Sequence, residues 1–245
     1  PANITDRYHL NQSPFVVSLL SLFLVEEHNY RLVDIMRALS SPYCEFQHSG
    51  DPLDAGNIHA VASLLKITTG RTTWIKRIED RLAFMNRELQ SSDDDYDAVR
   101  FQREKEMLVK ALADIRALTA LLRRFSSPMK PQEFKKHLVD LLQELRVLER
   151  LLLGQTMASP RLEIDTRAYQ KFLMFLDEFL DILTIEGKEN EALPLSVYTE
   201  RLRQTIAEVR YNVKQRYGYG VYVTSMDETR GLSFDVMFIA GLVDG

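Results

Sequence analysis

The chain has 245 residues, of which 45% are hydrophobic and 27% charged, and these fractions exclude a disordered chain and leave room for one large or two modest domains. Thirty-one basic residues stand against 35 acidic ones, so the formal charge of −4 excludes a surface that is basic throughout, and any contact with DNA is expected to be a local patch. Only ten glycines and eight prolines are present, which argues against a β-sandwich or β-barrel and predicts a mainly α-helical fold.

Cysteine usage and the terminal residues bear on the compartment and the extent of the chain. The single cysteine, Cys44, cannot form an internal disulfide, and one cysteine with five scattered histidines argues against a structural zinc site. With no apolar run as long as the roughly 18 residues of a membrane span and no signal peptide at the start, we expect a cytoplasmic protein. Because the chain begins at Pro1 and ends at Gly245 just after a strand-like run, we expect an internal piece of a longer protein.

Helical patterns dominate the first 216 residues. Ser13 followed by Pro14 predicts the start of an almost wholly apolar helix, and a second helix is expected over 30–40, so residues 1–50 form an N-terminal helical pair. In a helical bundle over 51–216, apolar residues recur every three or four positions, which predicts helices over 57–69, 71–90, 97–125, 132–153, 165–186 and 195–216. The long stripes of 97–125 and 132–153, joined by a short loop, predict an antiparallel helical hairpin.

The pattern changes at Tyr217. Two short apolar runs, 221–223 and 236–240, predict strands, and the second is continuously apolar, as in a buried parallel strand. A polar loop, 224–235, separates them. We therefore expect residues 217–245 to be a strand–loop–strand piece from the edge of an α/β domain.

The usual catalytic motifs are missing from this sequence. It contains no phosphate-binding loop, no zinc-protease motif and no nucleophile elbow, and the acidic run at 93–97 lacks the glycine and distal glutamate of a calcium loop. That run is interpreted instead as acids that cap the start of a helix. We expect no catalytic residue, no metal and no cofactor in this chain.

The C-terminal end carries a resemblance to a known family. Residues 220–245, GVYVTSMDETRGLSFDVMFIAGLVDG, resemble motif V of superfamily 1 DNA helicases of the UvrD/RecB kind, in which a strand, a K-G-L-E-F-like loop and a strand ending in G-L-x-x-G follow one another. The matching positions are Arg230, Gly231, Leu232, Phe234, Phe238, Gly241, Leu242 and Gly245. Asp227 stands where a histidine is usual and Ser233 where an acid is usual, and these departures resemble the degenerate motor that AddB- or RexB-type proteins contribute to bacterial ATP-dependent helicase-nucleases.

A second segment also resembles this family. Residues 10–46, with S-P-F-V-V-S-L-L-S-L and L-x-x-I-M-R-A-L-S-S-P-Y, are similar to the segment that such proteins carry upstream of motif V. The resemblance implies that 51–216 is an accessory insertion in the second RecA-like motor domain, of which 217–245 is a strand–loop–strand fragment. It implies a helicase and exonuclease subunit for double-strand-break repair and recombination, working on DNA with a partner subunit, with ATP and magnesium bound elsewhere in the whole protein.

The resemblance places a nucleic-acid contact in the loop before the last apolar run. The expected binding residues are Thr224, Ser225, Arg230 and Gly231. Hydroxyls, one guanidinium and free backbone N–H groups suit a phosphate, and hold single-stranded DNA without reading its bases. In the alternative interpretation the loop is a plain turn, in which Arg230 pairs with Asp227 or Glu228. The basic aromatic run 210–219 either extends the groove by stacking or packs as part of an amphipathic helix.

A function of another class also stays open. A non-catalytic helical scaffold, whose apolar faces bind a partner protein without any nucleic-acid role, fits the helical pattern equally well. The full-length gene discriminates the two, because a helicase-nuclease subunit has a phosphate loop upstream, intact or decayed, and a nuclease motif downstream.

Overall fold

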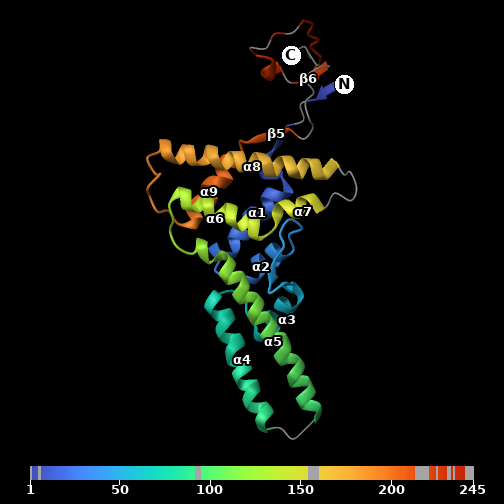
Figure 1. Cartoon of the computed structure of the whole chain (residues 1–245), viewed down its shortest axis with the longest axis vertical. Coiled ribbons are helices and arrows are strands. Elements are labelled where there is room, and N and C mark those ends of the chain that lie inside the picture. Colours follow the sequence, from blue (N-terminus) through green and yellow to red (C-terminus); the bar gives the residue numbers. More distant parts are fainter. Residues whose placement is uncertain are drawn as a thin grey trace, which may run out of the picture.

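The computed structural model describes residues 2–4, 7–91, 95–153, 160–212, 221–224, 226–230, 233 and 235–240. This part of the chain is mainly α-helical, as predicted (Figure 1). The helices are α1 (Pro14–Glu27), α2 (Leu32–Leu39), α3 (Ala55–Leu65), α4 (Arg71–Ser91), α5 (Asp95–Leu122), α6 (Pro131–Glu144), α7 (Val147–Leu153), α8 (Pro160–Ile185) and α9 (Leu195–Ile206). The strands are β1 (Ala2–Ile4), β2 (Arg7–His9), β3 (Gln47–His48), β4 (Asp51–Pro52), β5 (Arg210–Asn212) and β6 (Val221–Val223).

Helix α1 forms the centre of the helical body and packs against α2, α8 and α9. It starts at Pro14 after Ser13, as predicted, and its nearly all-apolar sequence fits this central place because neighbours cover most of its sides. The ring of Phe15 meets those of Tyr43, Tyr169 and Phe172 at centroid distances of 5.4–5.9 Å. Aromatic packing therefore joins α1 to α8 and to the segment after α2.

Helices α4 and α5 form a long antiparallel arm that projects from the body (Figure 1). Ion pairs cross its seam, with Arg81 Nε 2.7 Å from Glu104 Oε1 and Arg116 Nη2 2.5 Å from Glu79 Oε1. The predicted hairpin of 97–125 with 132–153 is therefore wrong in its pairing, because α5 packs along α4 while α6 packs against α7 and α8.

Local geometry after α5 explains why the expected hairpin does not form. A 3-10 turn, Arg123–Phe125, ends α5, and Met129 then exchanges backbone hydrogen bonds of 2.9 and 3.0 Å with Leu193. These contacts tie the connection to the segment before α9 and direct α6 across the body. The predicted helix 132–153 is also divided in two, because Arg146 adopts a φ of 49° between α6 and α7.

Two small β-ladders lie where the chain enters and leaves the helical body. Strands β2 and β5 pair antiparallel, with Tyr8 opposite Tyr211, and β1 and β6 pair parallel, with Ala2 opposite Val221. The predicted helix 195–216 ends early, at Ile206, because β5 forms this ladder with β2 and Leu10 N donates to Val209 O at 2.8 Å. Strands β1 and β6 consequently lie together at one end of the molecule (Figure 1).

The two predicted C-terminal strands have different outcomes. The first is confirmed as β6, whereas 236–240 is not a strand, and Phe238 is 92% exposed there. A buried parallel strand needs neighbours on both sides and cover on both faces. Within the described residues no strand runs beside 236–240, so its apolar side chains stay in solvent. Among the described helices none is long and apolar enough to cross a membrane.

Candidate nucleic-acid interface

The loop after β6 contains the four predicted DNA-binding residues, two of which the structure describes. Thr224 follows β6 directly and is half-buried, and a 3-10 turn, Met226–Thr229, leads to the exposed Arg230. Within that turn Thr229 Oγ1 donates to Met226 O at 2.7 Å. Ser225 and Gly231 lie outside the described residues. Thr224 and Arg230 therefore stand at the two ends of one short turn.

The side chains that the alternative interpretation needs are not among those described. Asp227 and Glu228 belong to the 3-10 turn, but their side chains lie outside the described part of the structure. The pairing of Arg230 with either acid therefore stays a prediction. Thr224 and Arg230 each have an interaction with another group, so neither is a free donor in this structure.

Parallel pairing fixes where this loop lies relative to the sheet. Ile4 of β1 lies beside Val223 of β6, so both strands end at the same edge. In open α/β sheets ligands bind at the carboxyl ends of the strands, where the loops leave the sheet. The loop 224–230 leaves from that edge, and so does the chain that runs from β1 towards the helical body.

One interpretation of the basic aromatic run 210–219 is that its rings extend a DNA-binding groove by stacking, but Tyr211 does not do so. This side chain is only 7% exposed, and its ring lies 6.4 Å from that of Tyr8 across the β2–β5 ladder. Burial raises the pKa of the Tyr211 hydroxyl above its ordinary value. Tyr211 therefore stabilises the ladder and is not available to stack on a base. The rest of the run, 213–219, lies outside the described residues.

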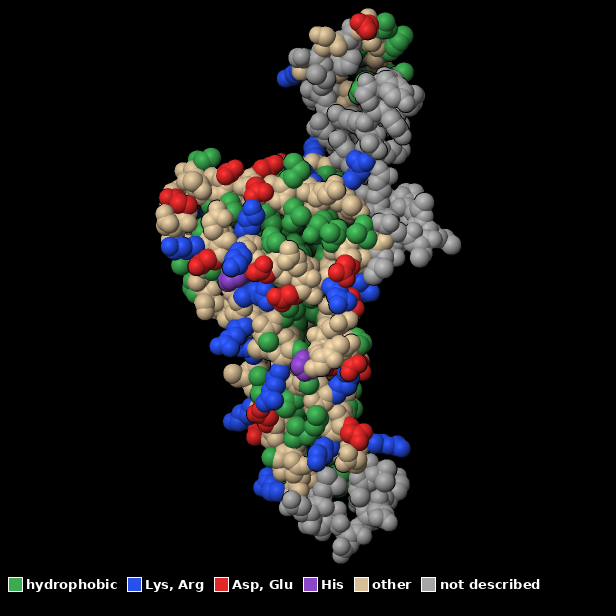
Figure 2. Space-filling view, in the orientation of Figure 1, with side chains coloured by type: hydrophobic (Ala, Val, Ile, Leu, Met, Phe, Trp, Pro, Cys, Tyr) green, Lys and Arg blue, Asp and Glu red, His purple; other side chains and the backbone are tan. Residues whose placement is uncertain are grey.

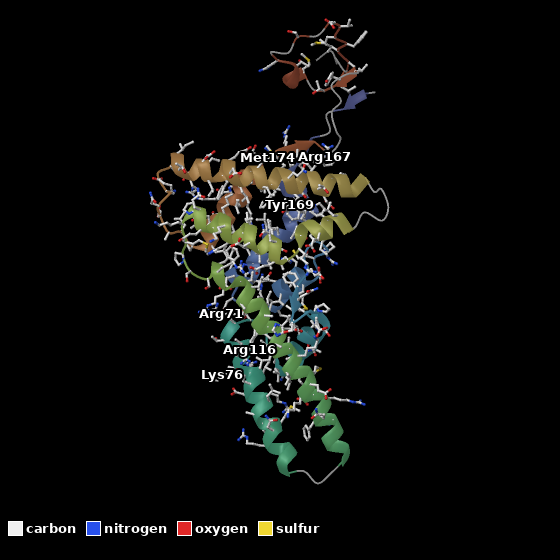
Figure 3. The ribbon with its side chains drawn as sticks, in the orientation of Figure 1. Arg71, Lys76, Arg116, Arg167, Tyr169 and Met174 are labelled. Carbon is white, nitrogen blue, oxygen red and sulfur yellow. The ribbon has the colours of Figure 1, made fainter. Side chains whose placement is uncertain are left out.

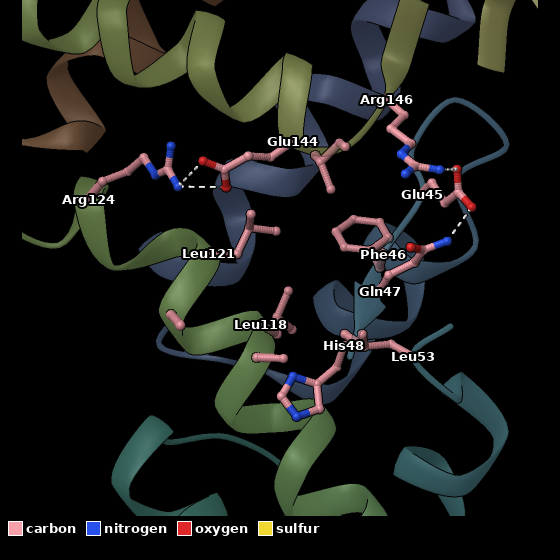
Figure 4. Close-up of a pocket in the computed structure, with 13 residues that line it drawn as sticks. Glu45, Phe46, Gln47, His48, Leu53, Leu118, Leu121, Arg124, Glu144 and Arg146 are labelled. Carbon is pink, nitrogen blue, oxygen red and sulfur yellow. Dashed lines mark hydrogen bonds and ion pairs between the residues drawn. The ribbon is translucent and has the colours of Figure 1, made fainter. Parts of the chain in front are cut away.

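A hollow of about 440 Å³ lies between β3, the end of α5 and the break between α6 and α7 (Figure 4). Its floor is apolar and includes Phe46, Leu53, Leu118, Leu121 and Leu145. Two ion pairs flank it: Arg124 Nη2 lies 2.7 Å from Glu144 Oε2, and Arg146 Nη1 lies 3.8 Å from Glu45 Oε2.

The charged side chains around this hollow form ion pairs with one another. Each arginine has its own carboxylate, so the hollow offers a ligand no uncompensated charge. Sequence reasoning did not find it, because its lining comes from three distant segments, 45–53, 117–124 and 144–146. Nor do the described residues bring together three His, Cys, Asp or Glu side chains that could hold a metal ion.

Comparison with known proteins found no matching family model, no matching curated protein and no matching solved structure. Function is therefore inferred from the residues and the geometry of the chain itself.

Proposed function

We propose that the chain is a helical insertion, with part of the surrounding sheet, of a DNA helicase-nuclease subunit that acts in double-strand-break repair and recombination. The parallel pairing of β1 with β6, in which Ala2 lies beside Val221, carries this proposal. The entire helical body is the connection between these two neighbouring strands. A domain inserted into one loop of an α/β sheet has this topology, because its ends must return to the same place.

The exposure of the β1–β6 pair supports its membership of a larger sheet. Parallel sheets are normally covered on both faces, and two strands alone have little stability in water. The side chains of Val221 and Val223 are 68% and 52% exposed, and Val236 is 70% exposed. Further strands and helices of a RecA-like domain would cover these apolar side chains.

The loop after β6 supplies the contact with single-stranded DNA in this proposal. It leaves the carboxyl edge of the sheet and carries Arg230, an exposed residue. A guanidinium contacts a phosphate through charge-assisted hydrogen bonds without distinguishing one base from another. The expected function of this loop is therefore to hold the strand in place rather than to read its sequence.

The experiment replaces Arg230 with alanine in the intact subunit, assembled with its partner subunit. Loss of one phosphate contact lowers the slope of log K against log salt by about 0.7 for a single strand, and to the same extent for different sequences. Fluorescence anisotropy of labelled oligonucleotides over a salt series measures both quantities. Arg103→Ala on α5 is the control, because Arg103 is also an exposed arginine but lies on the arm.

Folding is expected to change little in Arg230→Ala, because an exposed side chain in a loop contributes within about 0.5 kcal/mol. Unchanged DNA binding together with a clear loss of stability would contradict the DNA role. That result would identify Arg230 as a structural partner of acids in its own turn.

The second candidate function, a scaffold that binds a partner protein, rests on an exposed apolar surface. Leu148 and Leu152 of α7 are 46% and 43% exposed, and Met174 of α8 is 61% exposed. Figure 2 shows apolar side chains gathered over the part of the body formed by α6, α7 and α8. Exposed apolar patches of this kind are typical of protein–protein contacts.

Copurification with the partner subunit separates the two functions. A scaffold predicts that Leu148→Asp with Leu152→Asp abolishes copurification, while Arg230→Ala has no effect on DNA binding. Val109→Asp is the control, because Val109 is 50% exposed on the arm. Loss of DNA binding in Arg230→Ala with normal copurification of the α7 variant favours the DNA function instead.

A further inference from the structure

Two helix corners interlock where the arm joins the body. The α1–α2 corner, 28–31, and the α3–α4 corner, 66–70, are held by hydrogen bonds from Leu32 N to Thr68 O at 2.9 Å and from Gly70 N to Asn29 O at 2.7 Å. Trp74 Nε1 adds a buried hydrogen bond to Tyr30 O at 2.9 Å. These contacts fix the two corners relative to each other, so side chains on both belong to one rigid surface.

A fully buried carboxylate organises the first corner. The Asp34 side chain is 0% exposed, and its Oδ2 lies 2.8 Å from both Arg31 Nε and His28 Nδ1, while Oδ1 lies 3.7 Å from Arg37 Nη1. Burial alone would raise the pKa of Asp34, but the hydrogen bonds from Arg31 and His28 outweigh burial and hold this pKa below its ordinary value. The carboxyl is therefore ionised, and one negative charge faces two guanidinium groups.

The side chains around Asp34 keep much of their surface in solvent. The exposed fractions of the side chains are 49% for Arg31, 54% for Arg37 and 40% for His28. Because Asp34 is buried beneath them, the exposed side chains of Arg31, Arg37 and His28 are the part of this cluster that a ligand meets. Asp34 holds the guanidinium groups of Arg31 and Arg37 in place before a ligand arrives, and cations fixed in this way suit an anion.

The second corner adds more basic than acidic side chains, although Asp80 lines the same hollow as Lys76 and Arg77. Residues 66–78 contain Lys66, Arg71, Lys76 and Arg77 and no Asp or Glu. Arg71 is matched by Glu26 at 3.5 Å, but no carboxylate of the described residues pairs with the exposed Lys66 or Lys76. Arg77 Nη1 donates to the carbonyls of Leu65 and Lys66 at 2.9 and 2.8 Å, which fixes its guanidinium at the end of α3.

Together the two corners carry an excess of basic side chains in a chain whose formal charge is −4, because six cations stand against three acids: Arg31, Arg37, Lys66, Arg71, Lys76 and Arg77 against Asp34, Glu26 and Asp80. We name this surface the basic corner and define it by Arg31, Arg37, Lys66, Lys76 and Arg77 with His28 beside them. Figure 3 shows Arg71 and Lys76 near the end of α4 that joins the body. In an acidic protein such a local excess of cations attracts polyanions to one place.

We infer that the basic corner is a second nucleic-acid contact, which binds the phosphate backbone of DNA. Its cations come from several elements, namely α2 with the residue before it, the end of α3 and the first turns of α4, and several separate cations suit a row of phosphates better than one small anion. The inference rests on the proposed DNA function but uses residues of the helical body instead of the loop after β6. A strand bound at that loop would be held at a second place by this surface.

The test uses variants that keep the interlocked corners intact. Lys66→Gln with Lys76→Gln removes two cations that have no carboxylate partner, and adding Arg37→Gln removes a third while Arg31 still holds Asp34. The matched control is Arg103→Gln with Lys110→Gln, which removes two exposed cations from the arm. Melting temperatures of all variants verify that each protein is folded. If the triple variant does not fold, the double variant alone is used for the test.

Binding of labelled single-stranded and duplex oligonucleotides to the intact subunit is measured over a salt series. Three lost phosphate contacts lower the slope of log K against log salt by about 2 on a single strand. The double variant lowers it by roughly 1.4, from the same value for each contact, and the control leaves it unchanged. An unchanged slope in both corner variants overturns the inference.

Competition experiments separate this inference from its alternatives. Competition by inorganic phosphate or ATP as effective as competition by DNA would identify a free-phosphate site and overturn the backbone contact. Equal binding of polyglutamate would identify an acidic-protein surface and also overturn it. If Arg230→Ala weakens binding while the corner variants do not, only the basic corner fails, whereas no effect in either set contradicts the proposed function itself.

Discussion

Replacement of Trp74 by phenylalanine tests the interlocking of the two corners most directly. Trp74 is the only tryptophan, its side chain is 0% exposed, and its Nε1 donates to Tyr30 O at 2.9 Å. Tyr30 has a φ of 59°, so its carbonyl lies in a turn rather than in a helical ladder. Trp74→Phe removes the donor and leaves this buried carbonyl without the indole.

The magnitude follows from two losses. A buried acceptor without its partner costs about 1–3 kcal/mol. The smaller ring also leaves a cavity of about 40 Å³, which costs about 1 kcal/mol at about 24 cal/mol per Å³. The free energy of unfolding is therefore expected to fall by about 2–4 kcal/mol.

Urea unfolding followed by far-ultraviolet circular dichroism measures this change, because helical signal does not depend on the tryptophan that is removed. Val109→Ala is the control, since Val109 is 50% exposed on α5 and its truncation is expected to cost within about 0.5 kcal/mol. A Trp74→Phe variant no less stable than this control would refute the reasoning, because the indole would then contribute nothing to holding the corners together.

Three further predictions concern single buried groups. Leu141 of α6 is 0% exposed, so Leu141→Asp places an unpaired charge in the core and is expected to lower the free energy of unfolding by several kcal/mol. A variant that melts like the parent would contradict this packing. Burial raises the pKa of the Cys44 thiol to about 11. At pH 8 a thiol reagent is therefore expected to label Cys44 slowly in the native protein and rapidly in urea, and equal labelling rates would contradict its burial. Because the pKa of Asp34 is lowered in the fold, its stabilisation is complete above the ordinary titration range of an aspartate and is lost as the pH falls through the folded-state pKa. Urea unfolding of Asp34→Asn in mild acid is therefore expected to depend less on pH than that of the parent, and an identical pH dependence counts against the Asp34 cluster.

Local patterns in the sequence predicted most of the helices. The three- and four-residue spacing of Ile75, Ile78, Leu82 and Met85 predicts α4, and the structure has this helix from Arg71 to Ser91. Pro14 predicts the start of α1, because proline suits the first helical position. These elements were predictable because helical periodicity and capping depend on residues a few positions apart.

Pairing between distant segments could not be predicted in the same way. The apolar stripe of α5 fits any antiparallel partner, and the bridge between Met129 and Leu193 directs α6 elsewhere, so α4 occupies that place. The end of α9 depends on β5 pairing with β2, about 200 residues earlier in the chain. For the loop that we propose to contact DNA, the sequence placed Thr224 and Arg230 after a strand, but the position of this loop at the carboxyl edge of a parallel pair came from β1.

The sequence by itself determined that the chain is mainly helical, where most helices lie, and that Val221–Val223 is a strand, since each of these depends on the pattern of neighbouring residues. It also contained a signal for the basic corner, the four basic residues in 66–78, which Glu79 and Asp80 follow directly. Only the tertiary structure joined the α1–α2 corner to that segment, gathered Arg31 and Arg37 over a buried Asp34, and paired β1 with β6 around the helical body. Contacts between segments far apart in sequence are set by which surfaces can be buried together, and no local pattern records that choice.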